Sequence, residues 1–193
     1  MSASRRYVIL DRDGTLIEER NYLSDPAGVV LLPQALEGLR AFCEMGFGLV
    51  VVTNQAGIGR GYFTATDLQR VNDRLRALLR AGGVDWDEIY HCPHAPDAGC
   101  ECRKPKPGLA LRAARELEFD PRQAVVIGDK ACDLELGHAI GARTILVRTG
   151  YGAELAADSA ELARLHPDAV VADLSEAAAW VKAACANKDK KDK

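Results

Sequence analysis

Two aspartates near the start of the chain could carry out acid chemistry together. The stretch "YVILDRDGTL" places Asp11 directly after a short apolar run and Asp13 two residues later. One carboxylate can act as a nucleophile or metal ligand, and a neighbouring one can act as a general acid. Asp and Gly are also common turn residues, so this stretch alone is equally compatible with a surface turn.

Three later segments favour a site over a turn, because each puts polar groups after an apolar run or before a helical pattern. They supply Thr53 and Asn54, then Arg103, Lys104 and Lys106, then Asp129, Lys130 and Asp133. Carboxylates gathered at one rim repel one another unless a cation lies among them, and their oxygens suit Mg²⁺. The added hydroxyl, amide and basic groups predict a phosphate that bridges to this metal.

A cysteine-rich loop precedes the basic segment. In "HCPHAPDAGCECRK", Cys92 and His94 form one pair and Cys100 and Cys102 another, which is enough for a closed, tetrahedral and therefore structural zinc site. Exposed thiols on a mobile loop are an equally good interpretation, and His91, expected at the end of the strand "EIYH", is a rival ligand. A disulfide is disfavoured in a reducing compartment, and a catalytic thiol is disfavoured because a nucleophile already exists. The remaining cysteines and histidines are expected to be ordinary core or surface residues.

A metal in this loop would have a consequence for the phosphate site. Arg103 and Lys104 follow Cys102 without a gap. Fixing Cys102 to a metal would fix the direction of these two cations, so the loop would preorganise a phosphate site.

The elements that must position these residues alternate along the chain. Apolar runs at 7–10, 47–53, 124–128, 144–147 and 169–172 alternate with helical patterns at 34–45, 64–81, 108–118, 132–140 and 174–185. Such alternation predicts an α/β fold, a doubly wound, Rossmann-like parallel sheet with helices on both faces. Ligands bind such sheets at the carboxyl ends of the strands, where the polar residues lie.

Composition limits the function classes. The chain has 193 residues, 48% of them hydrophobic, and a net charge of −3. We expect a single domain over 1–186 and a disordered tail over 187–193. An acidic body argues against nucleic-acid binding, and no apolar run approaches the ~20 residues that span a bilayer. With no secretory leader and no evident oligomerisation segment, the expected protein is a cytoplasmic monomer with no membrane partner.

Four motifs resemble, in order and spacing, those of the haloacid dehalogenase-like phosphatases. They are Asp11-Arg12-Asp13-Gly14-Thr15, Thr53-Asn54, Lys104-Pro105 and Gly128-Asp129. The resemblance implies that Asp11 attacks phosphorus to form an aspartyl-phosphate and that Asp13 is the general acid and base. It implies that Mg²⁺ is held by Asp11, the Asp13 carbonyl and Asp129, with Asp133 behind. The implied catalytic set is Asp11, Asp13, Thr53, Arg103 and Lys104.

No large insertion separates the motifs, so we expect a capless enzyme with an open cleft. The cysteine loop resembles that of two groups in the family, the heptose bisphosphate phosphatases and the histidinol-phosphate phosphatases. The stretches "TNQAGIGRGYFT", "ERNYL" and "VRTGYG" favour the first group. That resemblance implies removal of the 7-phosphate of D-glycero-D-manno-heptose 1,7-bisphosphate, a step in the synthesis of lipopolysaccharide core precursors.

The same resemblance implies a set of substrate-binding residues. They are Glu19, Arg20, Asn21, Tyr22, Asn54, Gln55, Arg60 and Lys130. Arg60 could equally be a solvated loop residue. A histidinol-phosphate phosphatase, a phosphotransferase, a phospho-accepting receiver-like signalling module and a zinc module that binds nucleic acid remain as alternatives.

Overall fold

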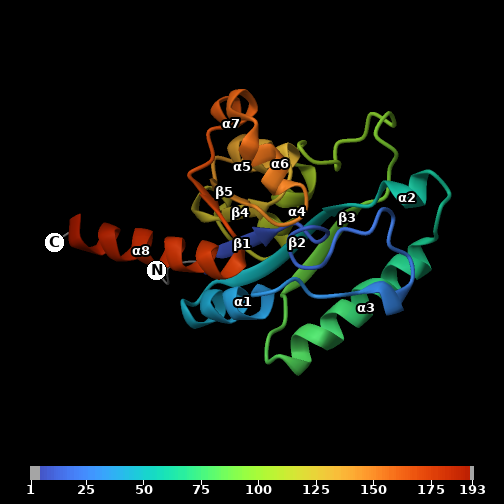
Figure 1. Ribbon diagram of the computed structural model, residues 1–193, viewed down its shortest axis with the longest axis horizontal. Helices are drawn as coiled ribbons and strands as arrows, with labels where there is room; N and C mark the ends of the chain where they lie inside the picture. Colours follow the sequence, from blue (N-terminus) through green and yellow to red (C-terminus); the bar gives the residue numbers. More distant parts are fainter. Residues whose placement is uncertain (1–4, 192–193) are drawn as a thin grey trace.

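Six parallel strands form one sheet in the order β3-β2-β1-β4-β5-β6 (Figure 1). The computed structural model describes residues 5–191, with side chains described up to Ala186. The strands are β1 (Tyr7–Leu10), β2 (Gly48–Asn54), β3 (Glu88–Cys92), β4 (Val125–Gly128), β5 (Arg143–Val147) and β6 (Ala169–Val171). The predicted doubly wound parallel sheet is confirmed.

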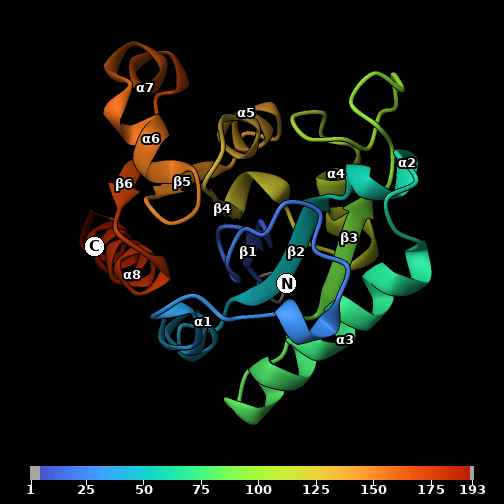
Figure 2. The same cartoon turned by 45° about the vertical axis from the view of Figure 1, so that its right-hand side comes forward.

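Helices cover both faces of the sheet (Figure 2). The core on one face packs helices α1 (Ala35–Glu44), α3 (Ala65–Ala81) and α8 (Leu174–Lys191). The core on the other face packs α4 (Gly108–Glu116) and α5 (Ala131–Ala139). The shorter elements are the 3₁₀ turns η1 (Pro26–Gly28) and η2 (Pro121–Gln123) and the helices α2 (Ala56–Gly59), α6 (Gly152–Ala157) and α7 (Ser159–Leu165). These short helices were not foreseen from the sequence.

The central strand β1 is buried on both sides because its alternate side chains point to opposite faces. Val8 and Leu10 pack into the core with α1, α3 and α8, whereas Tyr7 and Ile9 pack with α4 and α5. This two-sided burial explains why the strand appears in the sequence as a continuous apolar run.

Helix α3 shows how the sequence pattern becomes an element. Thr64 caps its start in a reciprocal capping box with Asp67, and Gly82 ends it. The predicted stripe is buried at Leu68, Val71, Leu75 and Leu79. Leu78 is partly buried and packs against the core on that face. One polar side chain, Asn72, is buried on the same helix.

The order of the strands creates the crevice for a site. The chain passes from β1 to β2 on one side and later returns to β4 on the other side, so the connections diverge at the carboxyl end of β1. Asp11, the last residue of β2 (Asn54) and the last residue of β4 (Gly128) therefore lie at one edge. In the described part of the chain no added domain stands over this edge, as predicted for a capless fold.

Helix α8 differs from what the sequence predicted for the C-terminal residues. Helix α8 continues to Lys191, past the point where a disordered tail was expected to begin. Because side chains from residue 187 and the whole of 192–193 lie outside the described residues, that tail stays a prediction.

None of the helices between residues 5 and 191 has the length and apolarity needed to cross a bilayer.

Candidate active site

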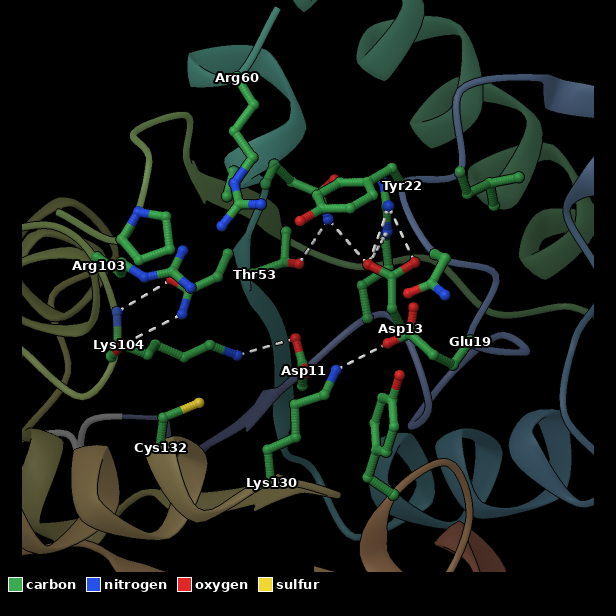
Figure 3. Close-up of a pocket in the computed structure, with 18 residues that line it drawn as sticks. Asp11, Asp13, Glu19, Tyr22, Thr53, Arg60, Arg103, Lys104, Lys130 and Cys132 are labelled. Atoms are coloured by element: carbon green, nitrogen blue, oxygen red, sulfur yellow. Dashed lines mark hydrogen bonds and ion pairs between the residues drawn. The ribbon is translucent and has the colours of Figure 1, made fainter. Parts of the chain in front are cut away.

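A cavity of about 290 Å³ opens at the carboxyl ends of β1, β2 and β4 (Figure 3). The structure brings together here most of the residues singled out from the sequence. Those that line the cavity are Asp11, Asp13, Glu19, Asn21, Tyr22, Thr53, Asn54, Gln55, Arg60, Arg103, Lys104 and Lys130.

Four of the residues singled out for the phosphate, substrate and magnesium sites do not line this cavity: Arg20, Lys106, Asp129 and Asp133. The guanidinium of Arg20 turns away to pair with Glu18 at 2.8 Å, and both side chains are largely exposed. Asp129 is fully buried next to the nucleophile candidate Asp11.

Lys104 is the electrostatic centre of the site. Its Nζ lies 2.8 Å from Asp11 Oδ1 and 2.6 Å from Asp133 Oδ1, and it donates to the carbonyl of Val52 at 2.7 Å. Burial lowers the pKa of this ammonium, but the charges of Asp11 and Asp133 outweigh burial and raise it. Lys104 therefore stays protonated although it is only 3% exposed.

The three buried acids have different proton affinities. Burial pushes the pKa of Asp11 upward, but the charges of Lys104 and Lys130 prevail, so its pKa lies below the ordinary value. Burial and then the charge of Asp11 raise the pKa of Asp129 to about 7. Burial also raises the pKa of Asp133 to about 6, against the opposing charge of Lys104. The nucleophile candidate Asp11, whose pKa is lowered, thus lies beside Asp129, whose ionised form an added cation would stabilise.

The donor set fits a hard divalent cation. Carboxylate oxygens of Asp11, Asp129 and Asp133 lie within 4.8 Å of one another. Asp129 Oδ1 is buried and has no hydrogen-bond partner among the described residues, as expected of an oxygen kept for a metal. Asp133 uses both of its oxygens, Oδ1 with Lys104 and Oδ2 with the backbone N–H of Lys130, whereas Lys104 pairs with Oδ1 alone of Asp11. Asp11 and Asp129 are therefore the better carboxylate ligands.

Glycines make room for this arrangement. Gly14 has φ +84°, and a Cβ at this position would collide with the Asp129 carboxylate. A Cβ on Gly128 would collide with Asp133 in the same way. The Asp-x-Asp-Gly motif thus needs its glycine both for backbone conformation and for close approach to a second acid.

Asp13 is held by residues that the sequence analysis did not assign to it. Arg12 donates to both of its carboxylate oxygens, at 3.0 and 3.1 Å, and Gln55 Nε2 donates to Oδ2 at 2.8 Å. The same Gln55 nitrogen donates to Thr53 Oγ1 at 2.9 Å, which places Asp13 beside the predicted phosphate site. One hint of this contact was present in the sequence, because Arg12 lies between the two aspartates.

The cysteine loop is tied to β2 through the backbone of Lys104. Asn54 Nδ2 donates to the Lys104 carbonyl at 3.2 Å, and the Lys104 N–H donates to Asn54 Oδ1 at 3.0 Å. Asn54 thereby orients the Lys104 backbone with both ends of its amide. Arg103 Nη1 is buried without a partner in the described residues and lines the cavity, so it can take up an anionic oxygen.

Aromatic and basic side chains form the mouth of the cavity. Tyr22 and Tyr62 meet edge to face with ring centres 4.8 Å apart, and the Arg60 guanidinium lies 5.7 Å from the Tyr22 ring. On the other side, Lys130 pairs with Glu19 at 2.8 Å and lies over the ring of Tyr151. Tyr151 and Cys132 also line the cavity, although neither was assigned to the site from the sequence.

Cys92, His94, Cys100 and Cys102 converge in the loop after β3. The contacts between their ligand atoms run from 3.1 Å, between His94 Nδ1 and Cys102 Sγ, to 3.6 Å, between Cys92 and Cys100. These separations are close to the roughly 3.4–3.8 Å between ligands of a tetrahedral ion with bonds of about 2.3 Å to sulfur, with two contacts a few tenths of an ångström shorter, and all are far longer than the about 2 Å of a disulfide. The four free side chains therefore fit a closed metal site, and His91, in β3, is outside the cluster.

Comparison with known proteins agrees with this geometry. The HAD-hydrolase-like family matches residues 101–177. A D-glycero-beta-D-manno-heptose-1,7-bisphosphate 7-phosphatase of Haemophilus influenzae is 40% identical over 152 residues, which cover 74% of this chain and 82% of that one. A D-glycero-alpha-D-manno-heptose-1,7-bisphosphate 7-phosphatase of Photorhabdus laumondii is 36% identical. The aligned region covers 76% of this chain and 84% of that one.

A solved structure is similar along nearly the whole fold. It is the D,D-heptose 1,7-bisphosphate phosphatase of B. bronchiseptica in complex with magnesium and phosphate, which is 31% identical and superposes with a TM-score of 0.83. The superposed region covers 92% of this chain and 97% of that one. The chain therefore belongs to the haloacid dehalogenase-like hydrolases, in the family of the D-glycero-D-manno-heptose-1,7-bisphosphate 7-phosphatases.

Proposed function

We propose that this chain removes the 7-phosphate of D-glycero-D-manno-heptose 1,7-bisphosphate through an aspartyl-phosphate on Asp11. The observation that carries this proposal is Asp11 at the end of β1, paired with buried Lys104 and close to Asp129 Oδ1, which has no hydrogen-bond partner in the described part of the chain. Relatives of that activity cover most of this chain, which supports the same substrate class here.

In the first step a carboxylate oxygen of Asp11 attacks phosphorus. The bond between phosphorus and the sugar oxygen breaks, and Asp13 gives its proton to the departing alkoxide. Arg103 and the Thr53 hydroxyl would hold the phosphoryl oxygens, and buried Lys104 would supply positive charge beside them as charge shifts toward the leaving group.

In the second step Asp13, now ionised, takes a proton from water. The water oxygen attacks phosphorus, the acyl phosphate bond breaks, and Asp11 leaves as a carboxylate with release of inorganic phosphate. The proton that Asp13 lost in the first step is thereby restored, and the cycle balances.

Magnesium would be held by the carboxylates of Asp11 and Asp129 and the backbone carbonyl of Asp13. When bound, it supplies positive charge between the anionic nucleophile and the anionic phosphate. Zinc in the site of Cys92, His94, Cys100 and Cys102 would be structural, because four protein ligands leave no open position. We further propose that the protein acts as a cytoplasmic monomer in the synthesis of ADP-heptose for lipopolysaccharide.

The test is phosphate release by purified protein with Mg²⁺ from the α and β anomers of the bisphosphate, from their monophosphates and from histidinol phosphate. We expect the highest kcat/KM for one anomer of the bisphosphate, and ³¹P NMR of the product should show the 1-phosphate intact. Asp11→Asn should abolish turnover while thermal unfolding remains cooperative. Preferential hydrolysis of histidinol phosphate would replace this substrate, and near-normal activity of Asp11→Asn would remove the mechanism.

A further inference from the structure

We propose that Arg12 and Asn72 form a buried positioning pair that fixes the Asp13 carboxylate for proton transfer to the leaving group. The proposal rests on the proposed role of Asp13 as general acid. It assigns to helix α3, which supplies no residue to the cavity lining, a part in the reaction.

The contacts of Arg12 divide into two sets. Its Nε and Nη2 form a fork that holds the two oxygens of Asp13 at 3.1 and 3.0 Å. Its Nη1 points the other way and donates to Asn72 Oδ1 at 2.8 Å. Because the guanidinium is planar and rigid, a bond at one end constrains the direction of the fork at the other.

Both members of the pair are enclosed. Arg12 is only 1% exposed and Asn72 only 4%. A buried cation is tolerated only when its donors are satisfied, so the Arg12 side chain depends on both partners. The backbone of Arg12 is equally constrained, since its carbonyl accepts from the N–H groups of Leu16 and Ile17 at 2.9 and 3.1 Å.

Asn72 has no evident reason to be polar except this contact. Its neighbours on the buried face of α3, Leu68, Val71 and Leu75, are apolar. Burying an amide among them costs free energy unless the amide is hydrogen-bonded. The one described side-chain hydrogen bond of Asn72 is the bond from Arg12.

The orientation of Asp13 matters for a particular class of substrate. Gln55 Nε2 bridges Asp13 Oδ2 and Thr53 Oγ1, at 2.8 and 2.9 Å, so the carboxylate that Arg12 holds lies next to the predicted phosphoryl site. A sugar alkoxide needs a proton from this group as it leaves, whereas p-nitrophenolate leaves as a stable anion. A defect in the position of Asp13 should therefore depend on the leaving group.

The experiment compares kcat/KM for the sugar bisphosphate and for p-nitrophenyl phosphate in the full-length protein with Mg²⁺. For Asn72→Leu we expect a loss of roughly tenfold or more on the sugar ester and about twofold or less on the aryl ester. Asn72→Asp keeps an acceptor for Arg12 and should restore activity on the sugar ester. If Asn72→Leu does not fold, Asn72→Ala is the milder truncation for the same comparison.

Val71→Ala is the matched control, because it truncates the adjacent buried residue of α3 without touching a polar group. It should lower the unfolding temperature with both kcat/KM values unchanged. Equal losses on the two esters in Asn72→Leu, no loss on either, or a gain on the sugar ester would each overturn the positioning role.

Asp13→Asn in the same assays separates this failure from a failure of the proposed function. If Asp13→Asn keeps its activity on the sugar ester, the proposed general acid is wrong. If Asp13→Asn loses activity on the sugar ester but the Asn72 variants do not, the general acid stands and only the positioning pair is wrong.

Discussion

Lys104 Nζ forms ion pairs with Asp11 and Asp133 at the same time, at 2.8 and 2.6 Å. The two acids come from different elements, since Asp11 follows β1 and Asp133 lies in the first turn of α5. One buried cation thus joins two segments of the site and offsets the repulsion between their carboxylates. The residue proposed to bind phosphate is therefore also part of what holds the site together.

Lys104→Met should cost both stability and activity. Removing the cation leaves two buried carboxylates without their partner, and breaking such a pair from one side costs about 3–5 kcal/mol. We expect a free energy of unfolding lowered by that order in urea titrations, together with loss of phosphate release. Lys106→Met is the matched control, because Lys106 is exposed and its one ion pair among the described residues is with exposed Glu101. An equally stable Lys104→Met would show that the acids are neutral or solvated in the folded protein.

Without Mg²⁺ the stability should fall as the pH rises from about 4 to 8. The pKa of Asp129 is raised to about 7 by burial, so its contribution is complete at low pH and is lost as the pH rises through 7. Asp133, with a pKa of about 6, acts in the same direction. Asp11 acts oppositely, because its pKa is lowered and its contribution is lost only in acid. The two raised pKa values therefore predict a free energy of unfolding that is lower at pH 8 than at pH 5.

Magnesium should reverse that loss, since it binds the ionised carboxylates of the folded state. Urea unfolding at pH 5 and pH 8, with and without Mg²⁺, measures both effects. Asp129→Asn should weaken the pH dependence, leaving the part that Asp133 contributes, and should remove most of the magnesium effect. An undiminished pH dependence in Asp129→Asn would assign it to other groups.

The convergence of the candidate site residues could be predicted because their places in the fold are local in the sequence. Asp11 and Asp129 follow strands, Thr53 lies near the end of β2, and Lys104 precedes α4, and parallel strands bring such positions to one edge. The strand and helix bounds were also close, since buried strands and the stripe of α3 leave a strong periodic pattern. The short helices α2, α6 and α7 were missed because a helix of a few residues shows no such period.

The parts that were missed depend on contacts between distant residues. Asn72 looked like an ordinary polar position in a helix, and only the folded chain brings it to Arg12, sixty positions earlier. Cys132 was expected to be unremarkable but lines the cavity, where burial raises the pKa of its thiol to about 12. Arg20 was grouped with its neighbours by resemblance, yet its side chain points to Glu18.

Arg60→Met should weaken binding of the phosphate that is not cleaved, without slowing cleavage of the other phosphate. Arg60 lies at the cavity mouth above the Tyr22 ring, away from the Asp11–Lys104 pair, so it is placed to bind the phosphate that is not cleaved. We expect KM for the bisphosphate to rise roughly tenfold with kcat little changed, and KM for a monophosphate to change far less. Arg20→Met, which removes a similar charge outside the cavity, is the control. A fall in kcat with unchanged KM would place Arg60 in the chemical step instead.

Removing a ligand of the cysteine cluster should disturb the phosphate site as well as the loop. Cys102 is followed directly by Arg103 and by Lys104, whose backbone is clamped by Asn54. Metal analysis of freshly purified, reduced protein should find about one zinc per chain. Cys100→Ser should lose that zinc, unfold about 5 °C or more below the parent, and bind inorganic phosphate more weakly. Cys43→Ser, an exposed thiol outside the cluster, should keep all three properties. If Cys100→Ser loses zinc but binds phosphate normally, the loop is stabilised by its metal without preorganising the site.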